Sequence, residues 1–217
     1  MPKEDDMTIT RTIAIIAAAT SLSACASVET ATRNAPLQTP QTQTATASLN
    51  VQAVQVSVPP SLTVSEANRY YPGGDIVWRE EPLGDRHAQV KAIFEDGLNM
   101  GLAALPQGPV PVVLEVEVTR FHALSEKARY TVGGVHAVQF EYRLVDPETG
   151  AALTEPRAIK ADFKAFGGSR AINAERNGIT QRVRITNRIA EVMQKELSQP
   201  GTFHAAHTGL IGAINQL

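Results

Sequence analysis

Every aromatic residue of this 217-residue chain lies between Tyr70 and Phe203. Because large apolar side chains supply most of the surface that a core buries, the folded domain must lie in this part of the sequence. Residues 26–50 contain no aromatic side chain and consist mainly of Thr, Ala, Gln, Ser and Pro. Such a segment cannot offset the entropy of ordering, so we expect a disordered tether over residues 25–50, a globular domain over residues 51–200 and a C-terminal tail over residues 201–217.

The composition narrows the classes of function. A net charge of −2 argues against binding to nucleic acid, because neutralising phosphates requires a surplus of basic side chains. The single cysteine, Cys25, excludes an intrachain disulfide and a cysteine-rich zinc site. We therefore expect no nucleic-acid partner, no cofactor and no metal.

The first 24 residues have the features of an export signal. Arg11 supplies a positive charge, and residues 13–19 form an apolar run much shorter than the roughly 20 residues that a membrane-spanning helix needs. Acidic residues precede Met7, so Met7 is an alternative to Met1 as the start of the protein. The apolar run leads into Leu22-Ser23-Ala24-Cys25.

These four residues resemble the lipobox of bacterial lipoproteins, in which a Leu and two small residues precede a Cys. The resemblance implies that a type II signal peptidase recognises Leu22, Ser23 and Ala24 and that acyl chains attached at Cys25 hold the protein to a membrane. A plain secretory signal that ends near a cysteine is the alternative. In the sorting rule of enteric bacteria, the absence of Asp at position 26 favours the outer membrane, facing the periplasm, over the inner membrane.

The residue pattern of the domain predicts an α+β fold. We expect an antiparallel sheet of about four to five strands with two helices packed on one face, in the order β-β-α-β-β-β-α. Asp146–Gly150 has the residues of a tight hairpin turn. Gly97 and Gly101 lie on the apolar stripe of the first helix and predict its close approach to the sheet. The expected strands are 51–58, 75–79, 112–119, 130–145 and 151–166, and the expected helices are 85–102 and 172 or 175 to 197.

Over residues 51–198, this order of elements resembles the small α+β domains of periplasmic lipoproteins, including auxiliary components of envelope transport systems. The hairpin between Leu144 and Leu153, with its Asp-x-x-Thr-Gly turn, also resembles theirs. The chain is similar as well to uncharacterised lipoproteins of alphaproteobacteria. The resemblance implies a fold and a location in the cell envelope, and it carries no activity.

One loop stands out as a candidate binding site. Tyr70 and Tyr71 precede Pro72, Gly73 and Gly74. Paired aromatic residues in such a loop either close one end of the core or form an exposed contact for a partner, and the sequence leaves both open. Trp78, a few residues later, is expected in the core.

The remaining polar motifs favour structural roles. Gly167-Gly168-Ser169 lacks the spacing of a phosphate-binding loop or a nucleophile elbow, and we expect a turn with Ser169 as a helix cap. His204 and His207 have no nearby carboxylate that would complete a metal site. Glu115 and Glu117 are expected on a solvated strand face. The arginines of the last helix are expected mostly on a solvated face, namely Arg176, Arg182, Arg184 and Arg188.

The sequence thus predicts a non-enzymatic, lipid-anchored envelope protein whose periplasmic domain binds or supports another envelope component. Its expected partners are the membrane, through N-terminal acyl chains, and an envelope protein. The alternative is an auxiliary solute- or lipid-handling subunit of an envelope transport system. A hydrolase that uses Ser169 with a histidine is a third hypothesis.

Overall fold

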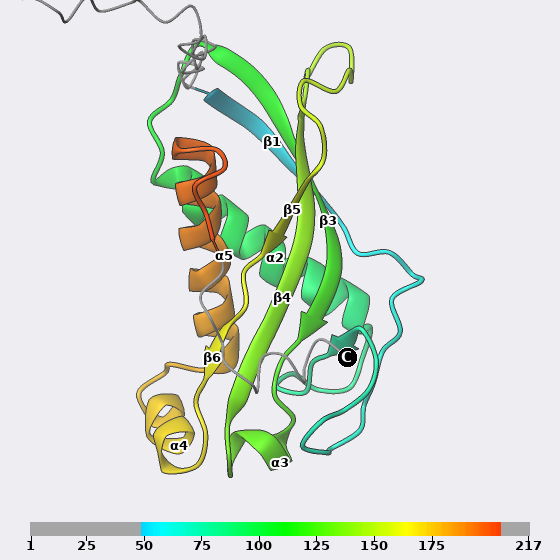
Figure 1. The fold of residues 1–217 in the computed structure, drawn as a ribbon, viewed down its shortest axis with the longest axis vertical. Coiled ribbons are helices and arrows are strands. Elements are labelled where there is room, and N and C mark those ends of the chain that lie inside the picture. The colour runs from blue at the N-terminus through cyan, green and yellow to red at the C-terminus, as the bar shows by residue number, and fades with distance from the viewer. Residues whose placement is uncertain (1–48, 205–217) are drawn as a thin grey trace, which may run out of the picture. The chain divides into compact units, whose positions relative to one another are not determined.

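The structure is a computed structural model that describes residues 49–204. These residues form a six-stranded, mostly antiparallel sheet with helices packed against it, which confirms the α+β prediction (Figure 1). The elements in chain order are β1 (Leu49–Ser57), β2 (Ile76–Val77), α2 (Arg86–Ala103), β3 (Val110–His122), α3 (Glu126–Arg129), β4 (Gly134–Val145), β5 (Arg157–Lys160), β6 (Phe163–Ala165), α4 (Ser169–Arg176) and α5 (Gln181–Ser198).

The strand directions differ from the prediction at the edge of the sheet. Strands pair in the order β1-β3-β4-β5, with β2 beside the end of β3 and β6 beside the start of β4. Strands β4, β5 and β6 continue the sheet in antiparallel pairings, whereas β1 and β2 run parallel to β3. The expectation of an antiparallel sheet is therefore wrong for β1 and β2. The reason is that α2 carries the chain back to the end of the sheet at which β1 began, so that β3 runs in the same direction as β1 and β2.

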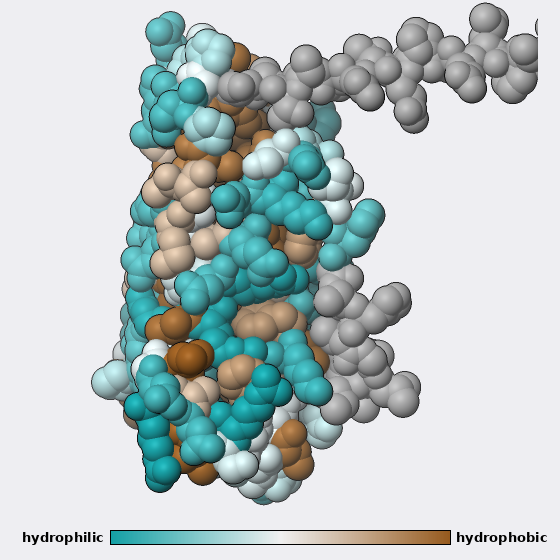
Figure 2. All heavy atoms as spheres, turned by 90° about the vertical axis from the view of Figure 1, so that its left-hand side faces the viewer, coloured by the Kyte–Doolittle hydropathy of each residue, from teal (hydrophilic) through white to brown (hydrophobic). Residues whose placement is uncertain are grey.

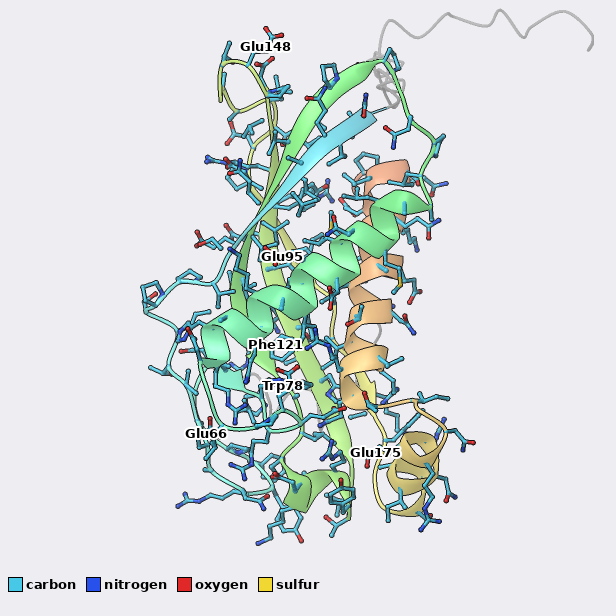
Figure 3. The ribbon with its side chains drawn as sticks, turned by 180° about the vertical axis from the view of Figure 1, so that it is seen from behind. Glu66, Trp78, Glu95, Phe121, Glu148 and Glu175 are labelled. Atoms are coloured by element: carbon cyan, nitrogen blue, oxygen red, sulfur yellow. The ribbon has the colours of Figure 1, made fainter. Side chains whose placement is uncertain are left out.

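The main core lies between one face of the sheet and helices α2 and α5. The rings of Trp78 and Phe121 meet edge to face with centroids 5.7 Å apart, and those of Phe94 and Phe140 do so at 5.4 Å. All four side chains are fully buried, and Figure 3 shows Trp78 and Phe121 beside α2. The prediction that Trp78 belongs to the core is confirmed.

Two glycines of α2 allow the two long helices to touch. A Cβ atom added to Gly101 would lie 2.6 Å from the carbonyl oxygen of Ala190, and one added to Gly97 would lie 2.8 Å from the Cβ of Ile189. Both neighbours belong to α5. The predicted close approach to the sheet is therefore wrong: α2 and α5 share one face of the sheet, and the glycines serve the contact between the helices.

The expected last strand and last helix are each divided. Residues 151–166 form two short strands, β5 and β6, instead of one long strand. The single expected helix is two helices, α4 and α5, because Gly178 between them adopts a φ of +76° that interrupts a right-handed helix. Strand β4 begins only at Gly134, since residues 126–129 form the short helix α3.

The hairpin turn after β4 is confirmed. The Asp146 carboxylate accepts hydrogen bonds from the backbone N–H groups of Glu148 and Thr149 at 2.9 and 2.8 Å. Gly150 has a φ of +70°, which favours glycine at this position. The turn thus lies at the end of the sheet where β4 finishes and β1 begins.

Candidate functional site

The loop between β1 and α2 presents two tyrosines to solvent. Tyr70 and Tyr71 are 42% and 57% exposed. Pro72 and Trp78, which follow in the sequence, are buried. The interpretation of the tyrosine pair as a plug for the core is therefore wrong, because Pro72 and Trp78 take the buried positions.

Hydrogen bonds fix the loop on both sides of the tyrosine pair. His122 Nε2 donates to the carbonyl oxygen of Pro72 at 2.8 Å, and Ser125 Oγ donates to that of Arg69 at 2.5 Å. The backbone N–H of Lys127 donates to the side-chain oxygen of Asn68 at 2.8 Å. The loop is thus attached to the end of β3 and to α3 immediately before and immediately after the two rings.

The protonation state of His122 suits this contact. The side chain is buried, and burial lowers the pKa of His122 below its ordinary value of 6.5. The ring is therefore neutral near pH 7, and a neutral imidazole has one N–H to donate. Because Nε2 faces a carbonyl oxygen, Nε2 carries that hydrogen.

A second set of contacts closes the neck of the loop. Strand β2 pairs with the end of β3, with Ile76 opposite Phe121. Just before β2, the Asp75 carboxylate accepts hydrogen bonds from the N–H and hydroxyl of Thr63 at 2.9 and 2.7 Å. These hydrogen bonds lower the pKa of Asp75, so the group is a carboxylate at neutral pH. Residues 63 and 75, twelve positions apart, are thereby held together.

Ion pairs connect the loop to α2 and α3. Arg86 Nε donates to Glu66 at 2.6 Å, and Arg79 Nε donates to Glu126 at 2.6 Å. The hydrogen bond from Arg86 lowers the pKa of Glu66. Burial acts to raise the pKa of Glu126, but the hydrogen bond from Arg79 and the nearby cations lower it overall. Charged groups from the loop, α2 and α3 are therefore joined at the base of the loop.

The other candidates from the sequence are not brought together. The lipobox residues, Leu22, Ser23, Ala24 and Cys25, lie outside the described residues, as does His207. Within residues 49–204, no hydrogen bond joins Ser169 to a histidine, and no group of three His, Cys, Asp or Glu side chains could hold a metal ion. In the same range, none of the helices has the length and apolar character to cross a membrane.

Ser169 is not a helix cap. It is the first residue of α4, and the N-cap is Gly168, with no side-chain hydrogen bond. A Cβ atom on Gly167 would lie 2.2 Å from the backbone nitrogen of Gly133. The close contact between the two backbones requires a glycine at position 167. The predicted Ser169 cap is wrong, because Gly168 takes the N-cap position.

The open face of the sheet carries a hollow of about 430 Å³ whose lining is polar and apolar in about equal parts. Glu117 is exposed, as predicted, and lies opposite Glu141 on β4. Glu115 is partly exposed on the same face and forms an ion pair with Arg143 at 2.6 Å, so the expected solvated strand face is confirmed. The lining also includes Gln55, Ser57, Tyr142 and Pro156.

The arginines of the last two helices are mostly engaged. Arg182 pairs with Asp96 at 2.8 Å and with Glu81, and Arg188 pairs with Glu191 at 3.0 Å. Arg184 stacks on the Phe166 ring at 3.6 Å and donates to the Lys164 carbonyl. Arg188 Nε also donates to the Ala161 carbonyl at 3.3 Å, so the expectation of a mostly solvated face is wrong for these three arginines, which join α5 to neighbouring segments. Arg176 is exposed.

His136 is a buried titratable residue that sequence reasoning did not single out. Its side chain is fully buried, and within the described part of the chain neither ring nitrogen has a hydrogen-bond partner. Burial, together with the positive charges of Arg184 and Arg129, lowers the pKa of His136 to about 3. The alternation of strand β4 gives a signal that could have found it, because His136 has the same parity as the buried Val138 and Phe140, whereas the solvent-facing polar residues of the strand have the opposite parity.

The fold and the loop define a small α+β domain that displays a fixed pair of tyrosines. The chain belongs to a family of unknown function (DUF6778), whose model matches residues 49–213. No curated protein matches the chain.

Three of the solved structures that are similar to the chain come from named bacteria. A candidate lipoprotein from Caulobacter crescentus CB15 is 17% identical, with a TM-score of 0.32, and the match covers 50% of this chain and 80% of that one. A DUF330 protein from Xanthomonas campestris is 13% identical, with a TM-score of 0.40 and coverage of 70% and 86%. A PelC variant from Paraburkholderia phytofirmans, a dodecamer, is 20% identical, with a TM-score of 0.32 and coverage of 67% and 88%. TM-scores this low transfer no function to the chain.

His136 predicts a specific pH dependence of stability. An unfolded histidine takes up a proton below about pH 6.5, whereas folded His136 does so only near pH 3, so its stabilisation is complete above pH 6.5 and declines as the pH falls towards 3. Between pH 8 and pH 5, the wild type should lose roughly 2 kcal/mol more unfolding free energy than a His136→Leu variant, measured by urea denaturation. The exposed His204, changed to Leu, serves as the control and should keep the wild-type slope. Equal slopes for wild type and His136→Leu would contradict this assignment.

Proposed function

We propose that this protein is a non-enzymatic, lipid-anchored component of the cell envelope. In this proposal acyl chains on Cys25 hold it to the outer membrane, and its domain faces the periplasm and docks onto another envelope component. Tyr70 and Tyr71 form the contact. The observation that carries the proposal is the exposure of both rings on a loop that is hydrogen-bonded on either side of them.

The physical argument rests on the cost of ordering a binding surface. Tyrosine is enriched at protein interfaces, where its ring contributes apolar area and its hydroxyl can accept or donate a hydrogen bond. A loop that is already fixed loses little conformational entropy on binding, so more of the contact energy appears as affinity. The bonds to Pro72, Arg69 and Asn68 provide this preorganisation.

The anchoring part of the proposal is supported by the lipobox and the tether. The domain begins with β1 at Leu49, which leaves residues 26–48 between the acylated cysteine and the first strand. If flexible, a linker of this length has an end-to-end distance of roughly 25–30 Å. The domain can therefore stand clear of the lipid headgroups and meet a partner.

The open face of the sheet favours a second candidate function. Its hollow of about 430 Å³ is of the size of small-ligand sites, and it supports the alternative of an auxiliary solute- or lipid-handling subunit. Such sites are mostly apolar, however, whereas only about half of the lining of this hollow is apolar, and four of its lining side chains are charged, namely Glu115, Glu117, Glu141 and Arg143. The tyrosine loop is for this reason the stronger basis for a function.

The anchor is tested at one residue. Replacing Cys25 with Ser removes the thiol to which an acyl chain would attach. The variant should lose labelling by a clickable palmitate analogue and move from the membrane to the soluble fraction. Continued labelling of the Cys25→Ser protein would contradict the lipobox assignment.

The docking surface is tested with a double variant, Tyr70→Ala with Tyr71→Ala. Since both rings are exposed, the change should leave the melting temperature within about 2 °C while reducing by at least tenfold the envelope protein that co-purifies after mild detergent extraction. Leu153→Ala is the matched control, because Leu153 is also exposed but follows the hairpin turn. Unchanged co-purification in the tyrosine variant would refute the docking role. Recovery of an integral inner-membrane permease would favour the transport alternative.

A further inference from the structure

The tyrosine loop is one part of a continuous surface at one end of the sheet. We call this surface the tyrosine end and define it as residues 68–72, 126–132 and 167–176. Lys127 Nζ lies 4.8 Å from the centre of the Tyr70 ring, which joins the loop to α3. The Tyr130 hydroxyl donates to Glu175 at 3.1 Å, which joins the segment after α3 to α4. Helices α3 and α4 lie at the same end in Figure 1.

Further apolar area is exposed on this surface beside the first two tyrosines. Tyr130 is 42% exposed and Val132 is 72% exposed. The guanidinium carbon of Arg129 lies 4.8 Å from the Tyr130 ring centre. Because Arg129 is buried, it packs against the inner side of that ring. The tyrosine end therefore offers three exposed tyrosine rings and a valine on fixed supports.

The acidic groups in and beside the tyrosine end are already neutralised. Glu66 pairs with Arg86, and Glu126 pairs with Arg79. Glu175 pairs with Arg129 at 3.3 Å. Each of these carboxylates thus has a cationic partner inside the domain.

The exposed cations of the same surface have no such partners. Four basic side chains of this surface are exposed, namely Arg69, Lys127, Arg170 and Arg176. Among the described residues, no carboxylate lies within ion-pair distance of any of them. The tyrosine end therefore has a surplus of positive charge. Part of it belongs to the face over α4 and α5, most of which is covered by hydrophilic side chains (Figure 2).

A stacked pair of arginines concentrates this charge. The guanidinium carbons of Arg170 and Arg184 lie 4.1 and 3.6 Å from the centre of the same Phe166 ring. Burial, and then the like charge of Arg170, lower the pKa of Arg184. Two cations held against one ring without a carboxylate between them form a site that an anionic group would stabilise.

The opposite end of the sheet has the opposite charge. Asp146, Glu148 and Glu155, in and after the hairpin turn, have no ion-pair partner within residues 49–204. The twelve residues of β4 separate the two ends by roughly 40 Å. Figure 3 shows Glu148 at one end and Glu66 and Glu175 at the other. The charge of the domain is therefore polarised along β4.

We infer that the tyrosine end docks an acidic protein surface, to which the exposed tyrosines contribute apolar contacts and Arg69, Lys127, Arg170 and Arg176 contribute ion pairs. This inference rests on the proposed docking function and names the chemistry of its partner. Complementary charge at the rim of an interface selects the partner and accelerates association, while buried aromatic rings supply much of the affinity. The acidic hairpin end repels the same partner and so fixes which end of the domain it meets.

An acidic protein fits this surface better than an anionic membrane does. The rings are tyrosines on loops whose positions are set by hydrogen bonds to Pro72, Arg69 and Glu175. Such fixed polar anchors suit a partner of defined shape. A peripheral membrane contact instead uses an amphipathic helix with Trp, Phe or Leu on its apolar face.

The inference is tested with the full chain carrying Cys25→Ser, labelled with ¹⁵N and kept in dodecyl maltoside. The probe is a 20-residue oligo-glutamate peptide, followed by two-dimensional NMR at low salt. The peptide should shift the amide signals of residues 68–71, 126–132 and 167–176. Combining Lys127→Glu with Arg170→Glu should raise its dissociation constant at least fivefold, because both cations lie in the proposed contact.

Lys195→Glu, a charge reversal at the far end of α5, is the matched control and should change the dissociation constant less than twofold. Equal binding by the control and the double variant, or no binding at all, would overturn the inference. The inference would also be overturned if phosphatidylglycerol, added to the micelles, shifted the same signals at a lower concentration than the peptide does. Loss of co-purification in the tyrosine variant, with no effect of the charge reversals, would leave the docking function intact and refute only the acidic partner.

Discussion

Residues 121–125, which comprise the end of β3 and the turn into α3, are the segment on which the candidate site depends. Phe121 packs against Trp78 in the core, and His122 and Ser125 donate hydrogen bonds to the tyrosine loop. The backbone N–H of Leu124 donates to the Gln181 side chain at the start of α5. Because one short segment contacts the core, the loop and α5, the positions of Tyr70 and Tyr71 follow from the packing of the main core rather than from local loop preferences.

Much of the architecture could be predicted from short-range patterns. The alternation of apolar residues along β3, the cap formed by Asp85 at the start of α2 and the Asp146 turn each depend on residues within a few positions of one another. The same holds for the tyrosine loop, which the Gly and Pro residues after Tyr71 mark as irregular structure. These features need no knowledge of the tertiary fold.

The features that sequence reasoning missed depend on contacts between distant segments. Whether the rings of Tyr70 and Tyr71 are buried depends on His122 and Ser125, about fifty residues away. Which element contacts α2 at Gly101 depends on what packs beside that helix. The apolar periodicity of α2 is the same whether the neighbour is a sheet or a second helix. Likewise, the paired state of Arg182 depends on Asp96, which belongs to another helix. Local patterns do not specify such partners.

The central claim is that the tyrosine pair is held in place before any partner binds. The most direct measurement is ¹⁵N relaxation of the backbone amides of Tyr70 and Tyr71, with those of β3 as the reference. Order parameters of about 0.85, equal to those of the strand, are the result that the fixed loop predicts. Values below about 0.6 for the two tyrosines, with rigid values in β3, would contradict it.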